Sequence, residues 1–309
     1  MKKVSVVIPT CNKKCLLSRT LGSLFSQRLD PSQFEIVVVD DGSQDGTSEI
    51  LENQHPVPLV FERHAETKGR APSRNTGILR ATGEIVVFLD DDMLVGPDFI
   101  QAHLTAQGDE EKRVVIGNVS TAPEANGSSV SRYLDTRGVK KVKDGKNIPP
   151  RYFLTNNSSV KRQFLLSVGL FDPEFITYGF EDVDLGHRMG KAGGEFVYAG
   201  NAESFHIHRH SLNELLEKKV LCGKSSLRIL IDKHPELGKV LRLNLLERPS
   251  LTKDDPDDIL RKLLLTIFLR KPFFRTGRFI AEHAPANPAT FKLMDFLVFY
   301  CYAEGLRWK

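Results

Sequence analysis

Short apolar runs alternate with helical patterns through the first half of the chain. Residues 4–8, 36–39 and 85–89 are mostly apolar and β-branched, which is typical of buried strands. After the first of these runs, Leu17, Leu21 and Leu24 recur at the spacing of one helical face. Strands that alternate with helices predict an α/β fold, in which helices wrap both faces of a mostly parallel central sheet.

The pattern continues less regularly toward the C-terminus. Further strands are expected at residues 58–61, 114–116, 156–160, 196–199 and 204–206. Helices are expected to begin near Pro72, Lys161 and Glu181. The polar residues 131–151 predict a mobile loop. From Leu212 onward we expect helices and then irregular chain, so the sequence predicts a domain over residues 1–211 and a mainly helical extension over 212–309.

The composition excludes several classes of protein. With 309 residues, 40% of them hydrophobic and 27% charged, the chain is neither disordered nor collagen-like. The four cysteines form no C-x-x-C pair, which argues against a disulfide scaffold or zinc knuckle and favours a reducing, cytoplasmic location. The apolar runs are shorter than the ~20 residues that a membrane-spanning helix needs. Basic and aromatic residues are not interleaved on one element, so nucleic-acid binding is not expected.

Positive charge is concentrated in the C-terminal extension. Residues 212–309 contain 18 Lys and Arg against 12 Asp and Glu, whereas residues 1–211 contain 25 against 27. Within residues 260–279, an apolar helical stripe that includes Leu263 and Ile267 lies beside several basic residues. Such a stretch is typical of a helix in the headgroup layer, so peripheral contact with the inner face of an anionic membrane is one expectation. The alternative is that the stripe packs on the rest of the protein.

Polar clusters follow three of the predicted strands, and in parallel sheets ligands bind beyond the carboxyl ends of the strands. The most informative cluster is the triplet from Asp90 to Asp92. Three adjacent carboxylates concentrate negative charge, and Mg²⁺ or Mn²⁺ can neutralise it while binding the phosphate oxygens of a substrate. The alternative interpretation is a solvated strand end that leads into a helix.

The other clusters have structural and functional interpretations. Asp41 lies in an Asp-Asp-Gly-Ser sequence, which is typical of a turn whose side chains bond to their own backbone. Arg70 and Arg74 flank Pro72 at a helix start, where guanidinium groups and free amides can hold a pyrophosphate. Arg74 could equally be the structural partner of an acidic loop.

The last two clusters lie further along the chain. Glu181 and Asp182 open a helix, where carboxylates favour the positive end of the helix dipole. Asp182 shares a helical face with inward-packed apolar residues, so it is also a candidate general base. His206 and His208 alternate with apolar residues and therefore face the same side of a strand, either as metal ligands or as a structural pair.

Taken in order, these clusters resemble the pattern of glycosyltransferase family 2, an inverting family with the fold called GT-A. The resemblance runs from about residue 4 to 208 and rests on seven motifs in the family's order. The motifs are SVVIPTCN from Ser5, VVVDDGSQDGT from Val37, GRAPSRNTG from Gly69, FLDDD from Phe88, NNSSV from Asn156, GLFD from Gly169 and YGFEDVDLG from Tyr178.

The resemblance implies a role for each matching residue. Pro9 and Asn12 would line the nucleoside pocket, Asp41 would pair with the base, and Arg70 would contact the donor near its phosphates. Asp90 and Asp91 would lie on the ribose and sugar side, and Asp92 would coordinate the metal with His206. The remaining roles are Asp182 as catalytic base and, on the acceptor side, Asn156, Phe180 and Glu181.

The resemblance therefore implies a Mn²⁺- or Mg²⁺-dependent transferase. It would move a sugar from a nucleoside diphosphate sugar, with UDP-sugars favoured, to a hydroxyl of a glycan or lipid-linked saccharide with inversion. Two alternatives are a sugar nucleotidyltransferase and a sugar-nucleotide-binding module without catalysis. The first usually needs a glycine-rich loop after the first strand, and residues 10–14 contain no glycine.

Overall fold

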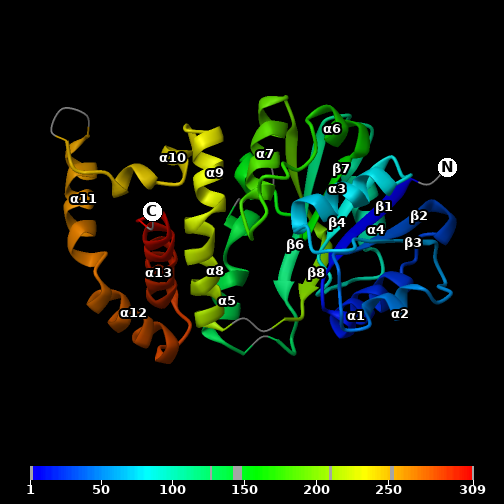
Figure 1. The fold of residues 1–309 in the computed structure, drawn as a ribbon, viewed down its shortest axis with the longest axis horizontal. Coiled ribbons are helices and arrows are strands. Elements are labelled where there is room, and N and C mark those ends of the chain that lie inside the picture. Colours follow the sequence, from blue (N-terminus) through cyan, green and yellow to red (C-terminus); the bar gives the residue numbers. More distant parts are fainter. Residues whose placement is uncertain (1–2, 126, 142–147, 209–210, 251–253, 308–309) are drawn as a thin grey trace. The chain divides into compact units, whose positions relative to one another are not determined.

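The computed structural model describes residues 3–125, 127–141, 148–208, 211–250 and 254–307, which belong to two units (Figure 1). The first unit consists of Met1–Gly127, Leu134–Ile176 and Glu181–Arg209. The second consists of Ser128–Tyr133, Thr177–Phe180 and His210–Lys309. Two short segments of the first 211 residues therefore belong to the C-terminal unit.

An eight-stranded sheet forms the centre of the first unit. Its strands are β1 Val4–Thr10, β2 Phe34–Asp40, β3 Leu59–Arg63, β4 Ile85–Leu89, β5 Met93–Val95, β6 Arg113–Thr121, β7 Asn157–Lys161 and β8 Glu195–His206. They are arranged in the order β3-β2-β1-β4-β7-β6-β8-β5. The first four run parallel, whereas β7 is antiparallel to both its neighbours and β5 is antiparallel to β8. The predicted α/β fold is confirmed, with a mixed sheet.

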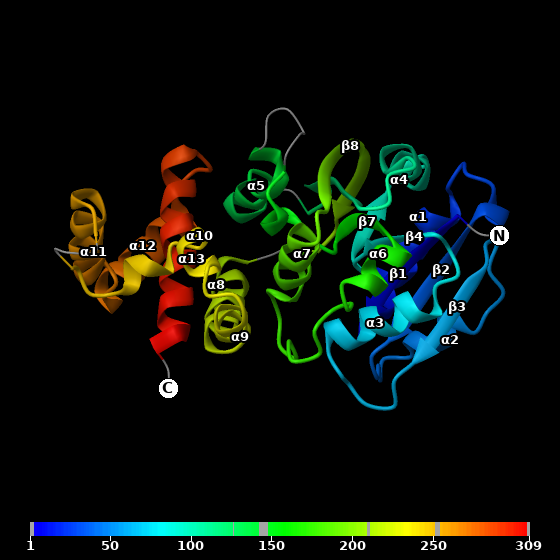
Figure 2. The same cartoon turned by 90° about the horizontal axis from the view of Figure 1, so that it is seen from above.

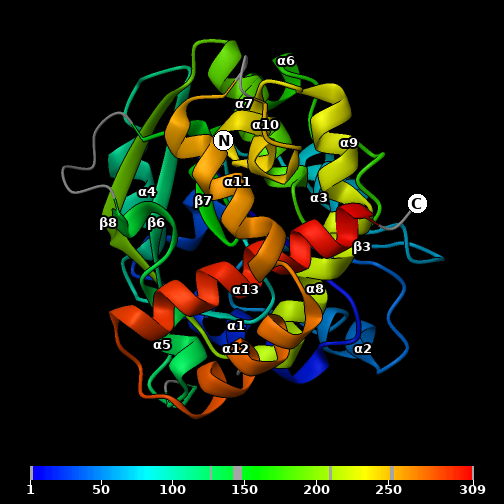
Figure 3. The ribbon, with the colours of Figure 1, turned by 90° about the vertical axis from the view of Figure 1, so that its left-hand side faces the viewer.

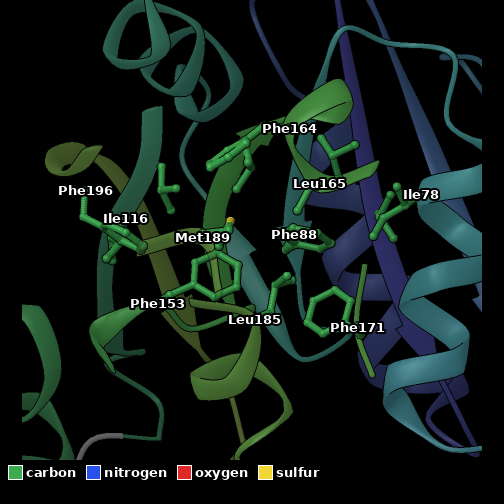
Figure 4. Packing of buried hydrophobic residues seen from close by; sticks show 14 of the residues in the cluster. Ile78, Phe88, Ile116, Phe153, Phe164, Leu165, Phe171, Leu185, Met189 and Phe196 are labelled. Carbon is green, nitrogen blue, oxygen red and sulfur yellow. The ribbon is translucent and has the colours of Figure 1, made fainter. Parts of the chain in front are cut away.

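Helices cover both faces of this sheet (Figure 2). They are α1 Lys14–Phe25, α2 Thr47–Leu51, α3 Arg70–Arg80, α4 Phe99–Gln107, α6 Arg162–Ser167 and α7 Glu181–Lys191. Successive side chains of each strand lie on opposite faces of the sheet, because the strand is pleated. Val6 and Ile8 of β1 pack toward α1 and α4, whereas Val7 packs toward α3, α6 and α7. In the latter layer, Phe88 meets the ring of Phe171 edge-on at 5.5 Å (Figure 4).

The second unit is helical. Its helices are α5 Ser129–Asp135, α8 Leu212–Lys224, α9 Ser226–Lys233, α10 Leu237–Val240, α11 Pro256–Phe268, α12 Lys271–His283 and α13 Pro288–Arg307. α13, drawn in red, packs against both α8 and α12 (Figure 3). Ser211 begins α8 with a capping box, in which its side chain accepts from Glu214 N–H and Glu214 reaches back to Ser211 N–H. The predicted helical extension is confirmed.

Three predictions were wrong in detail. The expected loop at residues 131–151 contains part of α5 and the short 3₁₀ segments Gly138–Lys141 and Pro150–Tyr152, while residues 142–147 lie outside the described ranges. Tyr133 of α5 packs on Phe291 of α13, a contact that the polar sequence of this segment does not indicate. The two strands expected within residues 196–206 are one strand, since its ladder with β6 continues past a register shift. Most of the chain between residues 256 and 307 is helical rather than irregular, since it forms α11, α12 and α13.

Two expectations about membranes and cysteines can be compared with the structure. Within the described ranges, no helix is both long enough and apolar enough to span a bilayer. Cys11, Cys15, Cys222 and Cys301 are all free thiols.

Candidate active site

The carboxyl ends of β1, β2 and β4 lie at one edge of the sheet, because these strands are adjacent and parallel. The polar residues that follow them are therefore brought together. Asp41 N–H donates to the Thr10 carbonyl at 2.8 Å, and the Thr10 hydroxyl donates to Asp91 Oδ2 at 2.8 Å. The three polar clusters at the strand ends thus form one hydrogen-bonded group.

Asp92 and His206 lie side by side because of strand pairing. β5 begins directly after Asp92 and runs antiparallel to the end of β8, with Met93 opposite His206. Ile207 N–H also donates to the Asp92 carbonyl at 3.0 Å. Nε2 of His206 lies 3.4 Å from Asp92 Oδ1, so the structure joins this histidine to the aspartate triplet.

Lys13 is a cation within the aspartate cluster that the sequence analysis missed. Its Nζ donates to Asp91 Oδ1 at 2.8 Å and to Asp92 Oδ2 at 2.9 Å. Both carboxylates are almost buried, at 7% side-chain exposure, whereas Lys13 is 31% exposed. Lys13 lies three residues after the end of β1, so a search for basic residues just beyond the strand ends would have found it.

The two buried carboxylates differ in their affinity for protons. Burial raises the pKa of Asp91, although the charge of Lys13 opposes this, and the charges of Asp92 and Asp90 raise it further. Burial acts in the same direction on Asp92, but His206, Lys13 and Arg70 outweigh it and hold its pKa below the usual range. The surroundings therefore favour the ionised form of Asp92 more strongly than that of Asp91.

The residues near Asp92 fit a divalent cation by their chemistry. Carboxylate oxygens and imidazole nitrogens are both metal donors, and here Asp92 just before β5 and His206 at the end of β8 bring one of each within 3.4 Å. Lys13 occupies the other Asp92 oxygen, which leaves Oδ1 on the side of His206. Asp92 and His206 are thus the residues of this edge that would hold a metal.

Asp41 is more deeply engaged in protein contacts than its expected role suggested. Its carboxylate lies 2.8 Å from His64 Nδ1 and accepts from the backbone N–H groups of Lys68 and Gly69 at 2.9 and 2.8 Å. Burial would raise its pKa, but these hydrogen bonds lower it below the usual value. Asp41 thus anchors the loop before α3. His64 directly follows β3, so it also lies beyond the carboxyl end of a strand, but the sequence analysis did not identify it.

Asn12 and Pro9 lie beside this loop. Asn12 adopts a left-handed conformation with φ of 53°, and its Oδ1 accepts from Gln44 N–H at 2.8 Å. Asn12 N–H donates to the Ser43 hydroxyl at 2.8 Å, so the end of β1 is tied to the turn after β2. Pro9 is half-buried in β1 opposite Val39 of β2. The expected nucleoside residues are therefore neighbours.

The two arginines of α3 have different surroundings. Arg70 is exposed at the start of the helix, and its charge lowers the pKa of Asp92. Arg74 is 1% exposed and donates from Nη1 to Glu181 Oε1 at 2.9 Å and from Nη2 to Asp90 Oδ1 at 3.2 Å. These contacts agree with the structural interpretation that the sequence left open, in which Arg74 is the partner of acidic residues.

The three carboxylates at the start of α7 also differ. Glu181 is buried against Arg74, and Asp184 is paired with Arg188 at 2.7 Å. Asp182 is half-buried and accepts from Val183 N–H at 2.8 Å, with no cation paired to it within the described ranges. Burial and the charge of Glu181 raise the pKa of Asp182 to about 7, although Arg74 opposes the shift. Asp182 is thus poised to exchange a proton near neutral pH.

The remaining acceptor-side residues lie in different surroundings. Asn156 is half-buried just before β7, whereas the next residue, Asn157, is buried and bonds to His103 Nε2 at 2.8 Å. Phe180 belongs to the second unit, where its ring lies 5.6 Å from that of Tyr302. The chain passes from the second unit to the first between Phe180 and Glu181.

Comparisons with solved structures reveal a shared fold. The chain is similar to the mannosyltransferase PcManGT from Pyrobaculum calidifontis in complex with GDP-Man and Mn²⁺, with a TM-score of 0.67 at 20% identity. That match covers 99% of this chain and 87% of the other. A second match is TarS 1–349 of S. aureus in complex with UDP-GlcNAc, with a TM-score of 0.57, 17% identity, and 99% and 89% coverage. The fold is the GT-A fold of glycosyltransferases.

Comparisons with protein sequences identify the family. The uncharacterized glycosyltransferase YfnE of Bacillus subtilis is 36% identical over 253 residues, which cover 66% of this chain and 64% of YfnE. Validoxylamine A glucosyltransferase of Streptomyces hygroscopicus subsp. limoneus is 32% identical over 216 residues, 60% of this chain and 47% of that protein. The chain thus spans less than two thirds of either relative. The sequence profile of Glycosyl transferase family 2 matches residues 5–166, and the chain therefore belongs to this glycosyltransferase family.

Proposed function

We propose that the protein transfers a sugar from a nucleoside diphosphate sugar to a hydroxyl group of a saccharide or lipid-linked saccharide, with inversion at the anomeric carbon. The observation that carries this proposal is the pair formed by Asp92 and His206 at the strand ends, 3.4 Å apart and beside Arg70. The membership of the family and the ligands of the solved neighbours, GDP-Man and UDP-GlcNAc, support a nucleotide-sugar donor.

In this proposal the donor binds along the carboxyl edge of the sheet. Pro9, Asn12 and Asp41 flank the nucleoside, and Arg70 contributes positive charge near the diphosphate. Asp41 acts chiefly by holding the loop between β3 and α3, since backbone N–H groups of Lys68 and Gly69 already donate to its carboxylate. A UDP-sugar is our expected donor among the nucleotide sugars.

Asp92 and His206 are the proposed ligands of Mn²⁺ or Mg²⁺. When bound, the cation neutralises the negative charge that develops on the departing nucleoside diphosphate. The imidazole favours Mn²⁺, because Mg²⁺ prefers oxygen ligands. Mn²⁺ is present in the PcManGT complex, which supports this preference. Lys13 and Arg70 add fixed positive charge to the same region.

Asp182 is the proposed general base. Its carboxylate takes the proton of the acceptor hydroxyl while the oxygen of that hydroxyl attacks the anomeric carbon. The bond from that carbon to the diphosphate oxygen breaks, and the nucleoside diphosphate leaves with the electron pair. Attack from the opposite face inverts the configuration, so no covalent intermediate on the enzyme is needed. A pKa of about 7 suits a base that works at neutral pH.

The decisive experiment measures release of nucleoside diphosphate from a panel of nucleotide sugars, with and without Mn²⁺ and a saccharide acceptor. We expect one donor to stabilise the protein in thermal unfolding only when metal is present, and product release to depend on the same metal. Donor binding without any release would favour the alternative of a sugar-nucleotide-binding module. Full activity after chelation would contradict the metal assignment.

Two variants test whether Asp92 and His206 bind the metal. Asp92→Ala should abolish metal-dependent donor binding, and His206→Ala should weaken it less, because the carboxylate supplies the charge. His283→Ala is the matched control, since this exposed histidine lies on α12 of the second unit. An unchanged dependence of the His206→Ala variant on Mn²⁺ would contradict the assignment of His206 as a metal ligand.

A further inference from the structure

The helices α11 and α12 expose an unusual number of large apolar side chains. Within the described residues thirteen such side chains are exposed, and eight of them lie on these two helices. They are Leu260, Leu263, Leu264, Ile267, Phe268, Phe273, Phe279 and Ile280, with exposures from 42% to 63%. Single exposed apolar residues are normal on a protein surface, but a concentration of them marks a site of interaction. We call these eight residues the apolar face.

α11 is turned the opposite way from an ordinary surface helix. Its only buried residue is Lys262, which is 2% exposed and donates to both carboxylate oxygens of Asp254 at 2.8 Å. In a helix that folds against a core in water, the leucines are buried and the lysine is exposed. Leu263 and Ile267 belong to the apolar stripe for which the sequence allowed either membrane contact or packing on the rest of the protein. Both side chains are about half exposed in the structure. The helix therefore presents its apolar side outward.

The apolar face also contains a groove. It is lined by residues of α11, α12 and α13 and has a cavity volume of about 360 Å³. Its lining includes Leu264, Phe273 and Phe296, and Thr276 is the only polar side chain in the lining. Apart from the hydroxyl of Thr276, the side chains of this groove offer no hydrogen bonds to a polar ligand. It suits the end of a hydrocarbon chain.

Basic residues outnumber acidic residues around the apolar face, although Asp258 pairs with Arg261, Glu282 with Arg278 and Asp254 with Lys262. Residues 259–281 contain six Lys and Arg and no Asp or Glu. Arg270, Lys271 and Arg275 are exposed, and within the described ranges none of the three forms an ion pair. A second copy of this chain docked face to face would bring these like charges together, which opposes a symmetric dimer through this face. An anionic surface would neutralise them.

We propose that the apolar face of α11 and α12 docks onto an anionic lipid bilayer. The apolar side chains enter the boundary between headgroups and acyl chains, and the basic residues contact lipid phosphates. The groove accepts part of an acyl chain. The contact is peripheral, since no helix within the described ranges can span a membrane. This inference does not depend on the proposed reaction, because it rests on the second unit alone.

The test is sedimentation of the full chain with vesicles at low salt. One set of vesicles is phosphatidylcholine alone, and the other contains roughly a third phosphatidylserine. We expect at least about tenfold stronger binding to the anionic vesicles, falling steeply with added salt. Equal recovery of the protein in the supernatant with both lipids would overturn the proposal.

Three variants separate the contributions of apolar and basic side chains to vesicle binding. The double variant Ile267→Ser with Phe279→Ser should lose most binding to both lipids, and Lys271→Glu with Arg275→Glu should lose the preference for anionic lipid. Leu221→Ser is the matched control, because Leu221 is 45% exposed on α8, outside the apolar face. All substituted side chains are exposed, so the thermal unfolding midpoints should stay close to that of the unsubstituted protein.

Insertion can be measured directly by fluorescence. Phe279→Trp should be quenched by lipids with brominated acyl chains, whereas Leu221→Trp should not, after subtraction of the signal from the native Trp308. If gel filtration instead gives a dimer that Ile267→Ser with Phe279→Ser converts to a monomer, and vesicles bind neither form, the apolar face is an interface between copies. That result would overturn the proposal.

Discussion

Arg74 of α3 donates to Glu181 of α7 at 2.9 Å, and both side chains are buried. The pair joins two elements that are far apart in sequence and fixes a negative charge directly beside Asp182. It therefore links α3 to the residue that we propose as the base. The charge state of Asp182 depends on both members of the pair, because Glu181 raises its pKa and Arg74 lowers it.

Glu181→Gln should move the pH dependence of transfer toward lower pH. The substitution removes a negative charge next to Asp182, so the pKa of Asp182 should fall from about 7, and the acidic limb of kcat/KM should shift down by about one pH unit. Measurement of kcat/KM between acid and neutral pH checks this. Glu217→Gln on α8 is the control. An unchanged limb would mean that Asp182 is not the titrating base.

Asp182→Asn should abolish transfer and stabilise the protein at the same time. The pKa of Asp182 is raised to about 7 in the folded state, above the ordinary value of 3.8. The favourable contribution of the protonated carboxyl is complete below pH 4 and is lost as pH rises through 7. Asparagine cannot ionise, so the variant should be more stable than the unsubstituted protein at pH 8 by at least about 1 kcal/mol.

Denaturant unfolding at pH 5 and pH 8 measures this difference, which should be much larger at pH 8. Donor binding should be retained, because the carboxylate of Asp182 accepts a hydrogen bond from Val183 of its own helix and Asp182 is not among the residues assigned to the donor. Transfer at the normal rate by Asp182→Asn would show that the base lies elsewhere.

Lys13→Met should make metal binding tighter and the metal-free protein less stable. Lys13 repels a cation at Asp92 while it neutralises two nearly buried carboxylates. Its removal should tighten the Kd for Mn²⁺ by about tenfold or more. The free energy of unfolding without metal should fall by roughly 1–3 kcal/mol, because charged hydrogen bonds are lost. Calorimetry with Mn²⁺ and denaturant unfolding test both statements, and weaker Mn²⁺ binding would contradict the first.

The sequence predicted the strand ends better than it predicted what each carboxylate does. The runs at residues 4–8 and 85–89 fall within β1 and β4, because buried parallel strands are apolar on both faces. Their order along the chain then implied that the three polar clusters would converge. Contacts made across the fold were not visible in the sequence. Lys13 and His64 were missed because a single basic residue carries no spacing signal, although His64 directly follows β3 and Lys13 lies three residues after β1.

The C-terminal unit was less predictable for a physical reason. A helical pattern in the sequence gives the direction of an apolar face, but not whether another element covers it. For α11 the usual assumption, that the apolar side packs inward, is wrong in this unit, since Lys262 is buried and Leu263 is exposed. The partner of Lys262 is Asp254, which precedes the helix, and no periodicity links the two residues.

The packing of α3 on the sheet gives a last prediction about stability. A Cβ atom added to Gly77 would lie 2.4 Å from Val7 Cγ1 of β1, much closer than atoms can approach. Gly77→Ala should therefore lower the free energy of unfolding by about 1–3 kcal/mol, in spite of the higher helix propensity of alanine. Gly22 lies in α1 with nothing within 4 Å of the added atom. Gly22→Ala should raise the free energy of unfolding by about 0.5–1 kcal/mol. Denaturant unfolding of both variants is the measurement, and a stabilised Gly77→Ala would mean that α3 can move away from β1 without cost.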